Sequence, residues 1–178
     1  MVADLTHALQ RLAPVAPILQ LLVAGGDIVN PSEVRDHLLA DHRTIRDRLL
    51  SIEKLAEEVV ANQRQLLGPL CEKTEVLLAG LRNHMSWEDL HLRPALLEAD
   101  AWGRERAALL DRDHAEQRQL LELKLEHLRD RTQPPILIAR GLLELVALLR
   151  DDMDREEELL LDPRILRDDV VGIDVEAG

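Results

Sequence analysis

The sequence lacks tyrosine and phenylalanine, has one cysteine, and carries only 22 basic against 34 acidic side chains in 178 residues. Trp87 and Trp102 are its two aromatic residues, too few to form a platform on which bases stack. Together with a formal net charge of −12, this makes the chain unsuited to binding nucleic acid. The single cysteine, Cys71, cannot form an intrachain disulfide or a thiolate metal cluster, and this usage is typical of a reducing compartment. We therefore expect a cytoplasmic protein.

Long hydrophobic runs are also missing, because no stretch reaches the roughly 18 to 20 consecutive apolar residues that a membrane span needs. The apolar run 12–26 is interrupted by Pro14 and Pro17 and is preceded by Asp4. We interpret residues 1–30 as a short amphipathic helical arm, with a cleaved leader peptide as the alternative. A composition of 46% hydrophobic and 31% charged residues is typical of one soluble domain, so we expect no membrane partner.

Apolar residues recur at helical spacing in four long segments, while β-branched residues are scattered. The breaks between segments lie at Gly68-Pro69, at 100–103 and at 132–135. Helices are expected from a cap at Ser32 to about 62, at 70–98, from the second break to about 131, and at 136–161. Short connections favour an all-α fold over residues 31–163, an up-down-up-down antiparallel four-helix bundle. Residues 164–178 lose the periodicity, and we expect an irregular acidic tail that is loosely held or contacts a protein partner.

Polar side chains interrupt the apolar stripe of each predicted helix. These inward-facing polar residues are His42, His84, Glu88, His114 and Glu157. Antiparallel helices place residues side by side when they are equidistant from the turn between them. By this measure the three histidines share one layer with Met153, and the two glutamates lie about one turn further along.

Burying unpaired carboxylates or charged imidazoles costs on the order of several kcal/mol, so such a layer needs a compensating group. Imidazole nitrogens and carboxylate oxygens are ligands of iron, and paired carboxylates can bridge two ions. The pattern therefore predicts a metal centre. A non-haem centre with two iron ions is the leading interpretation, and a single Fe or Zn ion is the alternative.

Four short motifs, in order, resemble those of the hemerythrin-like, or HHE cation-binding, family over about residues 32–163. They are Leu39-Ala-Asp-His42-Arg-Thr-Ile45, His84-Met-Ser-Trp-Glu88, Asp113-His114 and Glu157-Glu158. A proline follows six residues after the glutamate in both the second and the fourth helix, at Pro94 and Pro163. The resemblance implies a four-helix bundle whose non-haem di-iron site binds dioxygen, nitric oxide or peroxide, or senses iron.

One position departs from the family pattern. Where the family usually has a second His-x-x-x-Glu motif, this chain has Met153 four residues before Glu157. Because a thioether is a poor ligand for hard, oxidised iron, one position is left vacant, a neighbour substitutes, or the site has decayed. Asp152 is the best protein substitute, since hemerythrins use its five-residue spacing on their last helix. We expect His91, one turn beyond Glu88, to hydrogen-bond to Glu88 rather than bind metal directly.

The sequence thus predicts a hemerythrin-like protein that binds a small diatomic ligand or peroxide for sensing, storage or detoxification. The predicted metal ligands are His42, His84, Glu88, His114, Glu157 and Asp152. We expect a binding protein rather than an enzyme, with weak peroxide or oxidase chemistry left open. The alternative is a helical protein-interaction module whose metal site is mononuclear or empty.

Overall fold

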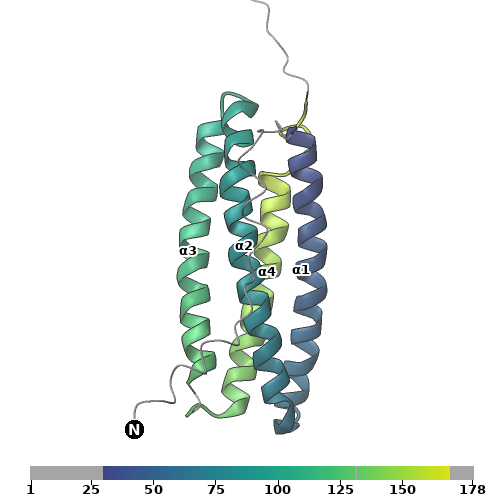
Figure 1. Ribbon diagram of the computed structural model, residues 1–178, viewed down its shortest axis with the longest axis vertical. Helices are drawn as coiled ribbons and strands as arrows, with labels where there is room; N and C mark the ends of the chain where they lie inside the picture. Colours follow the sequence, from purple (N-terminus) through teal and green to yellow (C-terminus); the bar gives the residue numbers. More distant parts are fainter. Residues whose placement is uncertain (1–29, 131, 169–178) are drawn as a thin grey trace, which may run out of the picture.

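The computed structural model describes residues 30–130 and 132–168. This part contains four long helices, α1 (Pro31–Val60), α2 (Leu67–Ala99), α3 (Gly103–Arg129) and α4 (Pro135–Leu159), and a short 3-10 turn, η2 (Arg64–Leu66). The helices lie side by side along the long axis of the molecule (Figure 1). The prediction of an all-α domain is confirmed, and no strand occurs between residues 30 and 168 where the chain is described. The arm expected at 1–30 lies outside the described residues except for Asn30.

The helix ends lie within three residues of the predicted ends, and the differences have local causes. Helix α1 begins after Asn30 rather than at a Ser32 cap, and Glu33 accepts a hydrogen bond from the Asn30 backbone N–H at 3.2 Å. Ser32 instead donates its hydroxyl to Asp168 at 2.7 Å. Pro69, expected to break the pattern, lies in the first turn of α2, where backbone N–H groups have no partner within the helix to lose.

Ion pairs across the helix interfaces show the direction of neighbouring helices. Arg46 of α1 contacts Glu157 of α4 at 2.7 Å, and Glu53, two turns further along α1, contacts Arg150 at 2.7 Å. Since the partner's number falls as the α1 number rises, these two helices run in opposite directions. Ion pairs between α2 and α3 follow the same rule: Arg82–Glu122 and Arg93–Asp111.

The apolar core consists of two clusters. The larger draws on all four helices and includes Leu49, Leu77, Leu121, Leu145 and Met153. The smaller lies toward the start of α1 and includes Leu38, Leu92, Leu110, Leu160 and Leu166. The buried polar side chains of His42, Glu88 and His114 lie between them in the sequences of α1, α2 and α3, so both ends of the polar layer are covered by leucine side chains.

The end of the chain contributes to this core. Leu166 is fully buried in the smaller cluster, and Asp168 accepts hydrogen bonds from the backbone and side chain of Ser32. Residues 164–168, expected to begin a loose tail, are therefore packed against the helices, because a leucine there completes the cluster at the open end of α4. Residues 169–178 lie outside the described part of the chain.

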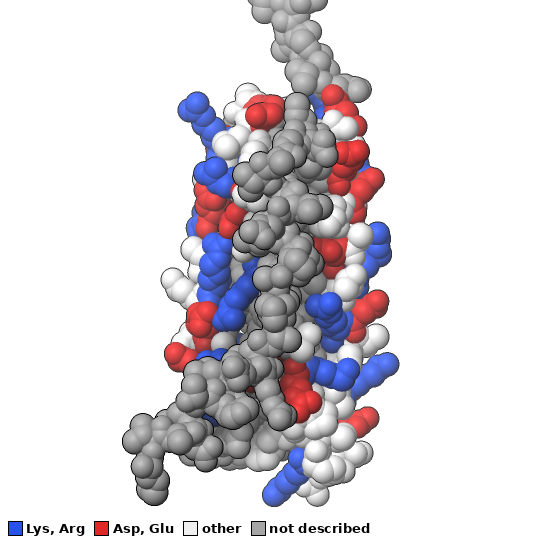
Figure 2. Space-filling view, in the orientation of Figure 1, with Lys and Arg blue, Asp and Glu red and all other residues white. Residues whose placement is uncertain are grey.

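The charged residues of the visible face are mixed in sign. In Figure 2 basic and acidic side chains alternate along the flanks rather than forming a single large patch. Among the described helices, none has the length and apolar character that crossing a membrane requires.

Candidate metal centre

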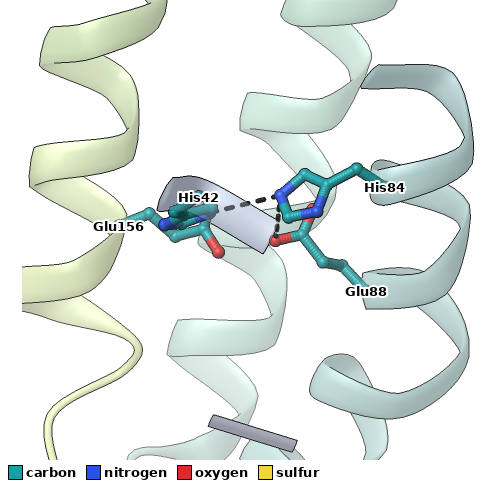
Figure 3. Close-up of side chains that lie close together, drawn as sticks. All are labelled: His42, His84, Glu88 and Glu156. Carbon is teal, nitrogen blue, oxygen red and sulfur yellow. Dashed lines mark hydrogen bonds and ion pairs between the residues drawn. The ribbon is translucent and has the colours of Figure 1, made fainter. Parts of the chain in front are cut away.

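Four side chains of metal-binding type converge from three helices in the polar layer (Figure 3). His42 comes from α1, His84 and Glu88 from α2, and Glu156 from α4. One ligand atom of each lies within 4.8 Å of the others. His42 and Glu88 are at most 1% exposed, which is the setting in which a shared cation is needed. We call these four residues the inner cluster.

The two histidines of the inner cluster face each other through the same ring nitrogen. Nε2 of His42 lies 3.2 Å from Nε2 of His84, and Nε2 of His84 lies 3.2 Å from Oε1 of Glu88. Nε2 of His42 also lies 3.7 Å from Oε2 of Glu156. Two imidazole nitrogens and two carboxylate oxygens that could bind a metal ion therefore lie close together.

The opposite ring nitrogens contact carboxylates outside the inner cluster. Nδ1 of His42 lies 2.8 Å from Glu157, and Nδ1 of His84 lies 3.5 Å from Asp41. A carboxylate beside Nδ1 favours the tautomer that carries its proton there and leaves Nε2 free as a lone pair. This is the usual arrangement around metal-ligating histidines. Burial lowers the pKa of His84, but its contacts with Glu88 and Asp41 outweigh burial and raise it, so a metal ion at Nε2 of His84 has to displace a proton.

His114 of α3 lies on the far side of Glu88. Its Nε2 is 3.1 Å from Oε2 of Glu88, and its Nδ1 is 2.7 Å from Asp89. Glu88 therefore directs one oxygen toward His84 and the other toward His114. A carboxylate in this position can contact a cation on each side.

Asp152 lies on the same side as His114. The two residues border a small cavity of about 10 Å³ together with Glu156. The Asp152 carboxylate accepts hydrogen bonds from Gln117 and, at 2.5 Å, from Arg155. Burial raises the pKa of Asp152, and hydrogen bonds from these partners oppose that effect.

Two carboxylate oxygens in the layer have no hydrogen-bond partner, Oε1 of Glu88 and Oε1 of Glu156. Oε1 of Glu88 is within ion-pair distance of His84 but is not aligned with a ring N–H. A buried polar atom without a partner costs about 1–3 kcal/mol, and more if it is charged. A cation between the two glutamates would satisfy both oxygens, so the donor set fits a metal ion.

The protonation states also suit metal binding. Burial by itself would raise the pKa of Glu88, but the neighbouring imidazoles of His114 and His84 outweigh burial and lower the pKa. Burial lowers the pKa of His42. Burial, together with the negative charge of Glu88, raises the pKa of Glu156 well above its ordinary value. Glu88 is thus a carboxylate and His42 a neutral imidazole, the forms that bind metal, while Glu156 holds its proton until a cation stabilises its carboxylate form.

The structure brings Glu156, rather than the predicted Glu157, into the inner cluster. The two glutamates lie three and four residues after Met153, and both spacings belong to one helix face, so periodicity alone did not separate them. Glu157 lies outside, where it accepts hydrogen bonds from His42 and from Arg46 at 2.7 Å. The four-residue step from Asp152 to Glu156 repeats that of His84-x-x-x-Glu88, and this repeat was the signal that would have set the register.

Two other residues of interest, Met153 and His91, lie among apolar or aromatic neighbours. Met153 is buried in the larger apolar cluster. His91, expected beside Glu88, instead packs against Trp87 with ring centroids 4.4 Å apart. The reason is helical rotation, since Leu92 and not His91 takes the fully buried position one turn beyond Glu88.

Comparisons with known proteins place these features in a family. Searches of curated proteins and of solved structures found no match. The family model for the hemerythrin HHE cation binding domain matches residues 33–162, which include the whole polar layer and all four long helices except the first two residues of α1. The chain therefore belongs to the hemerythrin HHE cation-binding domain family.

Proposed function

We propose that the protein binds non-haem iron in the polar layer and, through it, dioxygen, nitric oxide or peroxide, for sensing, storage or detoxification. The observation that carries this proposal is the inner cluster, in which two imidazoles and two carboxylates converge and two buried oxygens have no partner. Iron, when bound, supplies an open coordination position and redox chemistry. The cytoplasmic location expected from cysteine usage stays a prediction.

We assign the first ion to the inner cluster, held by His42, His84, Glu88 and Glu156. A second ion would take His114 and Asp152 as its own ligands, with Glu88 directing an oxygen to each side. In this assignment Asp152, four residues before Glu156, stands where the family has a histidine. Its carboxylate would be the substitute ligand that the sequence required.

The surrounding residues keep the site ordered and dry. Glu157 holds His42 through Nδ1, and Asp89 holds His114 in the same way. Removing such supporting carboxylates typically weakens metal binding by about 10- to 100-fold. The leucine clusters on both sides exclude water, which slows oxidation of reduced ions.

One observation favours a second candidate, a protein-interaction module with a single metal ion. His114 is not part of the inner cluster, and the Asp152 carboxylate is already hydrogen-bonded to Gln117 and Arg155. If the Asp152 carboxylate keeps its hydrogen bonds to Gln117 and Arg155, the protein binds one metal ion, in the inner cluster. The predicted protein partner of the tail stays a prediction, because residues 169–178 lie outside the described structure.

Metal analysis of protein purified without oxygen and reloaded with ferrous ion distinguishes these candidates. We expect close to two irons per chain and a visible charge-transfer band on exposure to oxygen. One equivalent without a band supports the single-ion module. Less than about half an equivalent of any metal contradicts both, because buried ligands retain their ion.

Three adjacent glutamates on α4 provide matched variants. Glu156→Gln removes an inner-cluster ligand, Glu157→Gln changes the support of His42 and the ion pair to Arg46, and Glu158→Gln alters an exposed side chain. We expect the iron content to fall most in the first, partly in the second, and not at all in the third. Equal iron content in all three would overturn the assignment of Glu156.

A further inference from the structure

A groove of about 460 Å³ runs along the surface between α3 and α4. Its lining combines apolar side chains, from Leu120, Leu148 and Leu149, with charged ones. In contrast, the groove of about 320 Å³ between α1 and α2 borders none of the candidate ligands. The α3–α4 groove, by comparison, is bordered by the candidate ligand Asp152.

A small inner cavity adjoins this groove and borders three of the candidate ligands. It is the space of about 10 Å³ bordered by His114, Asp152 and Glu156. Four side chains border both the groove and the cavity, namely Asp113, Gln117, Asp152 and Arg155. A space of this size accommodates about one water molecule, so it suits ions and diatomic molecules and excludes organic substrates.

Arg155 occupies the junction between groove and cavity. Its guanidinium lies 2.5 Å from Asp152 on its own helix and 4.0 Å from Asp113 across the groove on α3. The Arg155 side chain is 56% exposed, so these contacts are screened by water. Exposed ion pairs contribute only about 0.2–1 kcal/mol, and thermal motion can therefore open this one readily.

The charges of the groove add a preference among small solutes. Four carboxylates, from Asp113, Glu116, Asp151 and Asp152, line it against the single guanidinium of Arg155. A cleft lined mainly by one sign of charge concentrates ions of the opposite sign and repels ions of its own. The negative groove therefore speeds the entry of ferrous ion, leaves the entry of neutral diatomic molecules unchanged, and slows the entry of small anions.

We infer that the α3–α4 groove is the entrance to the metal centre for metal cations and neutral diatomic molecules, and that Arg155 is the positioning residue that narrows it. This inference rests on the proposed function. Beyond the proposed function, it specifies the route by which solutes reach the metal centre and the class of solute that can enter. Neither follows from the identity of the metal-binding residues.

Matched arginine variants on α4 test the route. In Arg155→Ala the entrance is widened, whereas Arg150→Ala removes an ion pair to Glu53 at the α1–α4 interface. Uptake of ferrous ion by the full-length metal-free protein is followed without oxygen, and release is followed with a coloured iron chelator. We expect both rates to rise by up to about fivefold in Arg155→Ala, the upper limit that corresponds to one exposed ion pair, and to stay at the wild-type value in Arg150→Ala. Equal rates in the two variants would overturn the inference.

Neutralising groove carboxylates tests the charge preference. Glu116→Gln combined with Asp151→Asn changes two groove carboxylates that are not candidate ligands, and Glu57→Gln with Glu58→Gln removes the same charge from an exposed part of α1. We expect slower ferrous uptake and faster azide binding in the first pair only. The same rates in both pairs would exclude the charge preference.

Iron content at equilibrium separates a failed entrance from a failed metal centre. If the wild-type protein and all variants bind the same amount of iron but the rates do not respond, the entrance lies elsewhere and the proposed function stands. If the wild-type protein binds no iron, both proposals are overturned.

Discussion

Replacing Glu156 with glutamine is expected to stabilise the metal-free protein and to destabilise the metal-loaded one. In the metal-free protein Oε1 of Glu156 is buried without a partner, and burial and Glu88 raise the pKa of this carboxyl group. Glutamine keeps the side-chain volume, cannot ionise, and offers an N–H donor in place of the acid's proton. The variant thus removes an unfavourable burial of the carboxylate form, which otherwise only a proton or a cation relieves.

The magnitude follows from the cost of an unsatisfied buried polar group, about 1–3 kcal/mol. For a domain of this size 1 kcal/mol shifts the melting temperature by about 2–4 °C, so the metal-free variant should melt about 2–12 °C above the wild type. A metal ion at 100 times its dissociation constant stabilises the wild type by about 2.7 kcal/mol, and the variant loses most of this gain. The order of stability should therefore reverse when metal is added.

The pH dependence provides an internal check. Because the folded-state pKa of Glu156 is raised, the native state holds a proton that the unfolded chain releases above about pH 4.5. The wild-type protein then loses stability as the pH rises through the folded-state pKa, whereas glutamine does not titrate. The advantage of the variant should vanish near pH 4 and grow toward neutral pH.

Thermal and urea unfolding in the presence of a chelator, and again with Zn²⁺ as a redox-inert ion, measure both effects. Glu158→Gln, an exposed change on the same helix, should stay within about 0.5 kcal/mol of the wild type. The reasoning is refuted if Glu156→Gln is less stable than the wild type in chelator at pH 7. That result would mean that the native carboxylate is already satisfied without a cation.

Further outcomes are expected at three other positions. Glu157→Gln should weaken zinc binding about 10- to 100-fold in a competition titration, because the hydrogen bond that orients His42 is weakened; an unchanged affinity contradicts this role. Asp89→Asn should lower the affinity for the second equivalent of metal and spare the first, which isothermal titration resolves; loss of the first instead would reassign His114. Leu166→Ala should lower the free energy of unfolding by about 2–5 kcal/mol in urea, and a change below about 0.5 kcal/mol would show that this segment is not packed.

The sequence by itself determined the helices and most of the polar layer. Apolar residues at three- and four-residue spacing specify which side of a helix is buried, so His42, His84 and His114 could be placed inside before any coordinates were known. Their equal distances from the intervening turns put them at a common level, because each residue advances a helix by a constant 1.5 Å. Glu88 followed from the four-residue step after His84.

Only the tertiary structure decided the choice between Glu156 and Glu157. Neighbouring residues on a helix differ by 100° in direction, and a stripe of leucines tolerates a rotation of that order. The rotation of α4 is set by how its side chains pack against α1 and by the ion pairs of Arg46 and Arg150, which involve residues far away in sequence.

The same reason applies to the supporting carboxylates and to the groove. Asp41 and Asp89 precede or follow ligands in sequence, yet each holds a histidine on a different helix. The opening between α3 and α4 depends on the spacing of two helices, which no local pattern records. Helical periodicity specifies a buried face to within about one residue, whereas positioning ligands around an ion requires the rotation and separation of whole helices, and these are set by packing across the bundle.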